Sequence, residues 1–253
     1  MDLNLAGRRA LVTGGSRGIG RAIVEVLAEE GCRVSFCARD AERVRTTEAE
    51  LRASGLDVHG HAADVTDDAA LRNWIAASAA DLGGIDILVA NAGALANTAD
   101  LSAWRHGFET DVLGTVATVE HAIPYLKKSE AGSIVIISSA AALEIYAGER
   151  PYNAIKATLT AYAGGLAQRL APDGIRANVV SPGAVMFEDS VWKKAQVERP
   201  EAYADMVDRT VIGRLGNPRE IAQAVAYVAS PVAGFVTGTN FVIDGGLTKR
   251  IHY

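Results

Sequence analysis

The sequence has few cysteines, and their spacing argues against a disulfide. Only Cys32 and Cys37 occur among its 253 residues, both around one expected strand. Five positions apart, their side chains would face opposite sides of an extended strand and could not form a bridge. We expect two free, buried thiols in a reducing cytoplasm. We assign neither of them to catalysis.

Basic clusters and long apolar runs are also missing. The formal net charge is −5 at pH 7 and no basic stretch stands out, which argues against a nucleic-acid partner. No apolar run is long enough to cross a bilayer, and the first residues lack the basic and apolar regions of a signal peptide. We expect a cytoplasmic protein without nucleic-acid or membrane partners.

Aromatic residues are scarce and no linker interrupts the chain. They make up 6% of the residues, whereas hydrophobic residues together make up 49%, with Ala, Val, Ile and Gly supplying much of the rest. Small and branched side chains suit close packing of helices on a sheet. Without a Pro/Gly/Ser-rich or low-complexity stretch, 1–253 is predicted to be one domain.

Short apolar segments alternate with helical patterns along the whole chain. This alternation predicts an α/β fold with a parallel sheet and helices on both faces. Ligands of such sheets bind at the carboxyl ends of the strands. The expected helices include 41–54, 104–126 and 152–170, and the expected strands are 9–12, 33–38, 57–62, 85–90, 132–137, 175–180 and 241–243.

A glycine-rich turn joins the first strand to the first helix. It reads Thr-Gly-Gly-Ser-Arg-Gly-Ile-Gly over 13–20, with Gly14, Gly18 and Gly20 where a side chain would obstruct. Such a turn lets backbone approach a phosphate, and the N–H groups of the helix N-terminus favour an anion. A glycine-rich loop alone is often only a tight turn. Between a strand and a helix that open a βα repeat, it indicates a nucleotide site.

Tyr152 and Lys156 lie four residues apart in Pro-Tyr-Asn-Ala-Ile-Lys. On a helix these positions share a face, so the phenol and the ammonium would point into the same space. A cation beside a phenol favours the phenolate, which makes a proton donor and acceptor usable near neutral pH. Ser138 and Ser139 end an apolar strand just upstream. Alone, a Tyr-x-x-x-Lys pair is more often a surface tyrosine and a solvated lysine.

Taken together, these motifs resemble the classical short-chain dehydrogenase/reductases, and among them the 3-oxoacyl-(acyl carrier protein) reductase-like members. The motifs are the glycine turn at 13–20, Asn91-Ala92-Gly93 after an apolar strand, Ser139, and Tyr152 with Lys156. The resemblance extends from Leu5 to about Thr248. It implies a Rossmann-type doubly wound sheet of about seven strands, and reversible hydride transfer between a nicotinamide and a carbonyl or alcohol. It also implies a homotetramer, with a dimer as the alternative.

The resemblance assigns roles to the catalytic residues. Ser139 would orient the substrate oxygen, Tyr152 would exchange the proton, and Lys156 would hold the nicotinamide ribose. The family usually has an asparagine in the long middle helix, where it helps to hold a water behind the lysine. Asp111 stands there in this sequence, and we include it as a fourth candidate catalytic residue. It either holds the water in the same way or weakens the relay.

The end of the second strand indicates which dinucleotide is bound. Where the family's NAD-binding members have a carboxylate, this sequence has Ala38, followed by Arg39, and Arg17 lies in the glycine turn. Two guanidiniums suit a phosphate monoester, so we predict NADP(H) rather than NAD(H). Alternatively Arg39 stacks on adenine or is solvated, and Asp40 follows it directly.

The remaining cofactor contacts also come from the resemblance. Asp64 and Val65 would lie at the adenine, Asn91 and Gly93 at the adenosine ribose, and Val185 at the carboxamide. A threonine that often contacts the cofactor is replaced by Phe187. The full predicted set, with no metal ligand in it, is Gly14, Ser16, Arg17, Gly18, Ile19, Gly20, Arg39, Asp64, Val65, Asn91, Gly93, Tyr152, Lys156, Pro182, Gly183 and Val185.

Residues 184–215 break the βα rhythm, and in the family this region closes over the substrate. Its large apolar side chains predict an apolar or ring-bearing substrate, although ordinary packing of a short helical pair explains them equally well. The opposite wall is expected to include Leu143, Ile145, Tyr146 and Glu149. The apolar side chains of the expected lid are Met186, Phe187, Trp192, Tyr203, Met206 and Val207.

Two other functions fit the same motifs. One is a regulator that binds NADP(H) without turnover, which only Asp111 favours. The other is a dehydratase or epimerase on the same scaffold. We expect a carbonyl reductase or alcohol dehydrogenase acting on a small molecule, and the sequence does not name that substrate.

Overall fold

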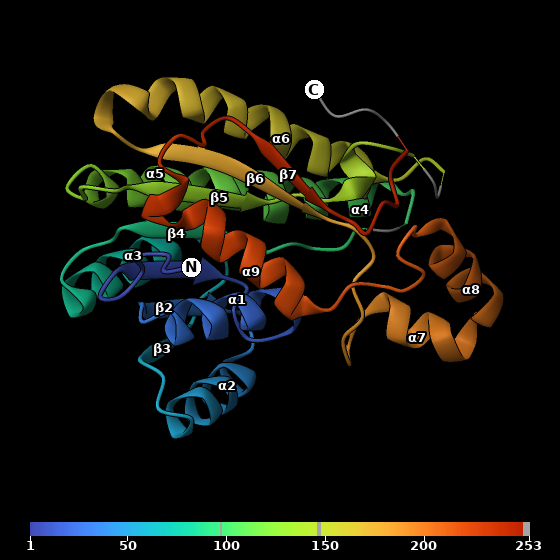
Figure 1. Ribbon diagram of the computed structural model, residues 1–253, viewed down its shortest axis with the longest axis horizontal. Coiled ribbons are helices and arrows are strands. Elements are labelled where there is room, and N and C mark those ends of the chain that lie inside the picture. Colours follow the sequence, from blue (N-terminus) through green and yellow to red (C-terminus); the bar gives the residue numbers. More distant parts are fainter. Residues whose placement is uncertain (97, 146–147, 250–253) are drawn as a thin grey trace.

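The computed structural model describes residues 1–96, 98–145 and 148–249 (Figure 1). Seven parallel strands form one sheet in the order β3-β2-β1-β4-β5-β6-β7, which is the predicted Rossmann-type fold. The strand order reverses direction between β1 and β4, so a crevice forms beside their carboxyl ends. The strands are β1 Arg9–Thr13, β2 Arg33–Ala38, β3 Val58–Ala62, β4 Ile87–Ala90, β5 Ser133–Ile137, β6 Arg176–Pro182 and β7 Asn240–Ile243.

Helices cover both faces of the sheet (Figure 1). Side chains of α1, α2 and α9 pack with one set of buried strand residues, and those of α3, α5 and α6 with the other. The α-helices are α1 Gly18–Glu29, α2 Ala41–Ala53, α3 Asp68–Leu82, α4 Leu101–Gly107, α5 Gly114–Leu126, α6 Pro151–Leu170, α7 Val191–Glu198, α8 Pro200–Arg209 and α9 Pro218–Ala229. Short 3₁₀ helices span Ala140–Ala142, Ala171–Asp173 and Pro231–Ala233.

Cys32 and Cys37 are free and buried in the two different apolar layers, as their spacing predicts. Cys32 packs with the α1 layer and Cys37 with the α3 layer. Burial raises the pKa of the Cys32 thiol to about 12 and raises that of Cys37 as well. Both thiols therefore stay protonated and unreactive at neutral pH.

The predicted helix over 104–126 is wrong in its start and in its continuity. The structure has α4, then a π-helical segment Phe108–Leu113, and then α5. A π turn adds a residue to the helical repeat and rotates the side chains that follow it. Asp111 lies in this segment and is buried. The other elements differ from their predicted bounds by one or two residues.

None of the helices among the described residues has the length and apolarity that spanning a bilayer requires.

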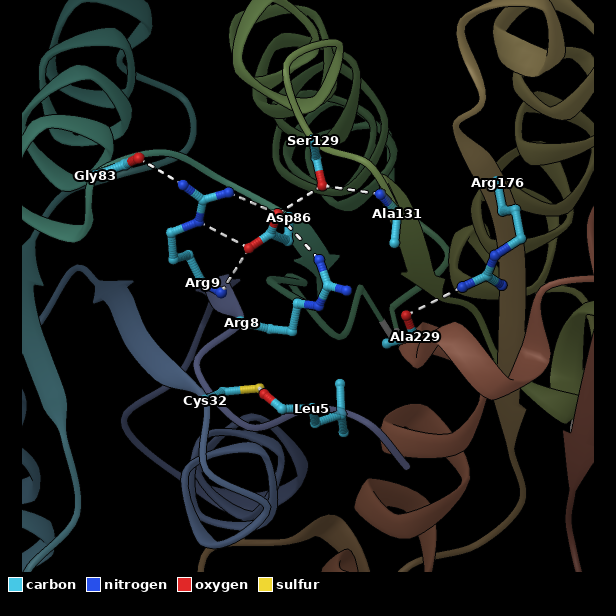
Figure 2. Close-up of polar contacts among 10 residues, drawn as sticks. All are labelled: Leu5, Arg8, Arg9, Cys32, Gly83, Asp86, Ser129, Ala131, Arg176 and Ala229. Carbon is cyan, nitrogen blue, oxygen red and sulfur yellow. Dashed lines mark hydrogen bonds and ion pairs between the residues drawn. The ribbon is translucent and has the colours of Figure 1, made fainter. Parts of the chain in front are cut away.

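A buried ionic network ties the amino ends of the central strands together (Figure 2). Asp86 has a side chain only 3% exposed and receives two hydrogen bonds from the Arg9 guanidinium, at 2.7 and 2.8 Å. Ser129 donates a further hydrogen bond to it. Burial would raise the pKa of Asp86, but the hydrogen bonds from Arg9 and Ser129 outweigh burial and hold that pKa below its usual value. The carboxylate thus links β1 and β4 with the turn before β5.

Asp86→Asn is expected to lower the free energy of unfolding at pH 7 by about 2 kcal/mol, because it removes the buried charge that pairs with the partly buried Arg9 guanidinium. A carboxylate whose pKa is depressed in the folded state stabilises the protein above its unfolded pKa of about 3.9, and loses this contribution as the pH falls through the folded pKa. The difference between the two proteins should therefore shrink in acid. Urea unfolding at several pH values measures it.

Asp57→Asn is the matched control, because the Asp57 side chain is half exposed where it pairs with Arg33 at 3.1 Å. That change should cost less than about 1 kcal/mol. Equal losses at the two positions would contradict a structural role for Asp86.

Candidate active site

A cavity of about 900 Å³ lies along the carboxyl ends of the strands. Within the described part of the chain, its lining includes every predicted site residue except Asp64 and Asp111. The predicted residues that it brings together are Gly14, Ser16, Arg17, Gly18, Ile19, Gly20, Arg39, Val65, Asn91, Gly93, Ser139, Tyr152, Lys156, Pro182, Gly183 and Val185.

The glycine turn is held against β4 by a side chain. Asn91 donates from its amide nitrogen to the carbonyl oxygens of Thr13 at 2.9 Å and Gly14 at 3.2 Å. A Cβ atom at Gly20 would lie 2.1 Å from the Gly14 oxygen, so only glycine fits there. The family resemblance implies a ribose contact for Asn91. In the structure its amide holds the glycine turn by these hydrogen bonds and also lines the cavity.

The N-terminus of α1 faces the cavity with its backbone N–H groups uncapped by a side chain. Its N-cap residue is Arg17, whose side chain makes no capping hydrogen bond to the described residues. Gly18 follows with φ +52°, and Gly18 and Ile19 both line the cavity. Uncapped N–H groups at a helix N-terminus bind phosphate well. This cradle and the size of the cavity fit a dinucleotide.

Three arginines surround the end of β2. Arg17, Arg39 and Arg43 all line the cavity, and Arg43 was not singled out from the sequence. Asp40 also lies there, but its Oδ1 accepts the backbone N–H groups of Glu42 and Arg43 as the cap of α2. Its Oδ1 is thus occupied by the helix. Arg43 pairs with Asp189 at 2.6 Å, so Arg17 and Arg39 are the guanidiniums here with the weaker ties to other groups.

Asp64 lies beside this group rather than in the cavity lining. Its Oδ1 accepts hydrogen bonds from the backbone N–H and the hydroxyl of Thr66, at 3.0 and 2.9 Å. Its Oδ2 lies 3.9 Å from Arg39 Nε, in a contact between exposed side chains. Such an exposed and long contact holds Arg39 only weakly.

The two serines after β5 have different surroundings. The Ser138 hydroxyl donates to the Lys156 carbonyl oxygen at 2.8 Å, inside α6. Ser139 Oγ accepts the Ala141 backbone N–H at 3.1 Å and keeps its own proton to donate. Both serines line the cavity. The Ser138 proton is already donated to α6, so Ser139 is the serine whose proton is left for a bound ligand.

Tyr152 and Lys156 share one face of α6, as the spacing predicts. The Lys156 ammonium lies 5.9 Å from the centre of the Tyr152 ring and donates to the Ile137 carbonyl oxygen at 3.2 Å. Tyr152 is half-buried, whereas Lys156 is buried. The phenol therefore reaches the cavity with a fixed cation behind it.

Asp111 makes a buried ion pair with Lys156. Its Oδ2 lies 3.0 Å from the Lys156 ammonium, and both side chains are at most 6% exposed. Its Oδ1 accepts the Ala94 backbone N–H at 2.7 Å. The preceding residue, Thr110, lines the cavity with a buried hydroxyl that has no hydrogen-bond partner within the described residues. A buried hydroxyl without a partner is a natural place for a water molecule.

The segment 184–215 is pinned together at its two ends. Gly216 donates to the Ala184 carbonyl oxygen at 3.0 Å and accepts from the Met186 N–H at 2.8 Å. Met186, Trp192, Tyr203, Met206 and Val207 pack in one small apolar cluster, as expected of a helical pair. Phe187, Trp192 and Met206 also line the cavity. The apolar side chains of this segment therefore both pack together and face the cavity.

The expected opposite wall differs from the structure. Among the described residues, the cavity lining does not include Leu143, Ile145 or Glu149, and Tyr146 lies outside those residues. Ile145 is 73% exposed. Arg150 and Asn153, on either side of Tyr152, line the cavity instead.

Comparisons with known proteins agree with this geometry. Residues 14–248 match a family model described as enoyl-(acyl carrier protein) reductase. The chain is 35% identical over 248 residues to isoepoxydon dehydrogenase from Aspergillus clavatus, covering 96% of each chain. It is also 35% identical to cis-4-hydroxycyclohexanecarboxylate dehydrogenase from Sinomonas cyclohexanicum, covering 96% of this chain and 97% of that one.

A solved structure shares the fold over nearly the whole chain. It is L-sorbose reductase from Gluconobacter frateurii complexed with NADPH and L-sorbose, with a TM-score of 0.90 and 28% identity, covering 99% of this chain and 100% of that one. With the family model covering most of the chain, the protein belongs to the short-chain dehydrogenase/reductase family and is an NAD(P)-dependent oxidoreductase of alcohol and carbonyl groups.

Proposed function

We propose that this protein transfers a hydride between NADP(H) and the carbonyl or secondary alcohol of a small, apolar or ring-bearing substrate. The observation that supports this most directly is one cavity that joins Ser139 and Tyr152 to an uncapped helix N-terminus. The apolar residues Phe187, Trp192 and Met206 line the same cavity. The relative that acts on cis-4-hydroxycyclohexanecarboxylate has a ring in its named substrate, which also favours this substrate class.

In this proposal the bound nicotinamide supplies or accepts the hydride. Ser139 donates a hydrogen bond to the substrate oxygen, and Tyr152 gives its proton to that oxygen during reduction or takes it during oxidation. Lys156 holds the nicotinamide ribose and places a positive charge beside the phenol. Val185 would bind the carboxamide, since the pairing with Gly216 uses the backbone groups of its neighbours Ala184 and Met186.

NADP(H) is favoured by charge at the end of β2. Arg17, Arg39 and Arg43 line the cavity there, while Asp40 uses its Oδ1 to cap α2. A 2′-phosphate would meet these guanidiniums, and the charge of the Asp40 carboxylate is partly offset by Arg43 at 3.8 Å. The NADPH in the L-sorbose reductase structure is consistent with this preference.

We further propose that residues 184–215 close over the substrate and that the protein is a cytoplasmic homotetramer, with a dimer as the alternative. The paired ends of the segment would let it move as a unit. On α6, Ala161 and Gly165 are exposed small residues that permit close contact with a second helix, whereas Ala163 and Ala167 are buried inward. A molar mass measured in solution distinguishes the two assemblies.

Loss of NADPH absorbance across a panel of cyclic and linear ketones tests the main proposal. In the same assay, Tyr152→Phe should reduce turnover by about 10²–10⁴-fold. The variant lacks the proton donor but keeps the ring, so affinity for NADPH should stay nearly unchanged by fluorescence titration. Tyr227→Phe, on α9 where its ring packs near Phe241, is the control and should be fully active. An active Tyr152→Phe enzyme would reject the assignment. Tight NADPH binding without turnover of any compound would instead favour a regulatory protein.

Arg39→Gln should lower kcat/KM for NADPH by about tenfold or more while leaving the value for NADH nearly unchanged, because only NADPH has the 2′-phosphate. Steady-state kinetics with both dinucleotides measure this. Arg45→Gln, an exposed change on α2, is the control and should alter neither value. A wild-type preference for NADH would overturn the NADP(H) proposal.

Asp111→Asn should lower the free energy of unfolding by about 3 kcal/mol, because it leaves the buried Lys156 ammonium without its charged partner at 3.0 Å. Urea unfolding at neutral pH measures this loss. Glu109→Gln, an exposed neighbour in the same π-helical segment, is the control and should unfold like the wild type. Unchanged stability in Asp111→Asn would show that the ion pair does not hold this part of the cavity together.

A further inference from the structure

Two arginines line the cavity away from the glycine turn, and the chemistry described above does not use them. Arg150 is the N-cap residue of α6, two positions before Tyr152, and is half-buried. Arg199 lies at the junction of α7 and α8 and is exposed. Both belong to the cavity lining, and in the sequence Arg150 precedes Tyr152 whereas Arg199 follows it. Neither guanidinium has an ion pair within 1–96, 98–145 and 148–249, in contrast to Arg43.

The carboxylates that line the same cavity already have partners, and for Asp40 these are the backbone N–H groups of Glu42 and Arg43. Asp189 lies 2.6 Å from Arg43 and Asp205 lies 2.8 Å from Arg209. Neither carboxylate is therefore left to balance Arg150 or Arg199. The phosphate-binding features lie elsewhere, at the α1 N-terminus and the end of β2. Arg150, two positions before Tyr152, and Arg199 are therefore positive charges in the cavity lining that no carboxylate of the lining offsets.

Apolar side chains share the cavity lining with these charges. Leu95 and Ala141 come from the side of β4 and β5, and Trp192, Met206 and Leu247 come from the segment around α7 and α8 and the end of the chain. Such a lining suits a ring or short aliphatic body, and two guanidiniums suit an oxyanion that accepts hydrogen bonds through two oxygens.

We propose that the substrate carries an anionic oxygen group, a carboxylate or a phosphate, which Arg150 and Arg199 bind while an apolar body joins that group to the reacting carbon. This inference rests on the proposed function, because it names a subclass of the substrates that Tyr152 and Ser139 would act on. The arginines fix the far end of the molecule, so the carbonyl or hydroxyl is directed toward the phenol.

The test compares ligands that share a ring and differ only in the anionic group. Cyclohexanecarboxylate, cyclohexyl phosphate and the neutral cyclohexanecarboxamide are titrated into the protein saturated with oxidised dinucleotide, by calorimetry. We expect at least one anion to bind tenfold or more tightly than the amide, and the comparison of the two anions identifies which of them the site takes. Since binding is the readout, the result does not depend on turnover.

Arg150→Gln and Arg199→Gln should each weaken binding of the preferred anion about tenfold and leave binding of the amide unchanged. Arg150→Lys and Arg199→Lys keep the charge and should retain part of the preference, which separates a charge effect from a folding defect. Arg105→Gln, an exposed change on α4 outside the cavity lining, is the control and should change nothing.

Equal binding of the amide and both anions would overturn the inference, as would anion binding that survives both glutamine variants. The proposed function has a separate outcome. Reduction of neutral ketones, together with no preference for anions, would retain the oxidoreductase and reject the anionic substrate. Anion selectivity in a protein that reduces no ketone would retain the binding site and reject the reaction.

Discussion

Burial of the Lys156 ammonium is the constraint on which the arrangement of the proposed active site depends. A buried cation must be paired and hydrogen-bonded, and here the Asp111 carboxylate and the Ile137 carbonyl oxygen meet that need. The second oxygen of the same carboxylate holds the Ala94 N–H after β4. One ion pair therefore sets the relative positions of the π-helical segment, the loop after β4 and the start of α6.

The dinucleotide end of the cavity is organised by neutral hydrogen bonds instead. Asn91 holds two carbonyl oxygens of the glycine turn, and the Thr13 hydroxyl accepts the backbone N–H groups of Asn91 and Ala92. Thr47 on α2 donates to the Ser16 carbonyl oxygen and fixes the turn from its other side. Preorganised backbone costs less to order when an anion binds, which suits a site that must release its cofactor in every cycle.

The fold and most of the site could be predicted from the sequence, because the glycine turn, Ser139, Tyr152 and Lys156 each follow a strand or share a helix face. Local patterns of this kind are set by positions close in the chain. The π turn that directs Asp111 to Lys156 depends on contacts between distant segments, and no periodicity in 104–126 indicates it. Arg150 was overlooked for a related reason. Its place in the cavity follows from how the chain enters α6, which the residue pattern before Tyr152 does not indicate.

The Asp86 network lies at the edge of the sheet opposite the cavity, and it separates what holds the protein together from what determines its chemistry. Contributions of distant, unconnected sites to stability add nearly independently. Changes in the segment around α7 and α8, or beside Tyr152, would leave the ties from Arg9 and Ser129 to that carboxylate intact. The substrate-binding edge of this scaffold can therefore change without loss of the ties at the other edge, and relatives of this chain are named for compounds as different as isoepoxydon and L-sorbose.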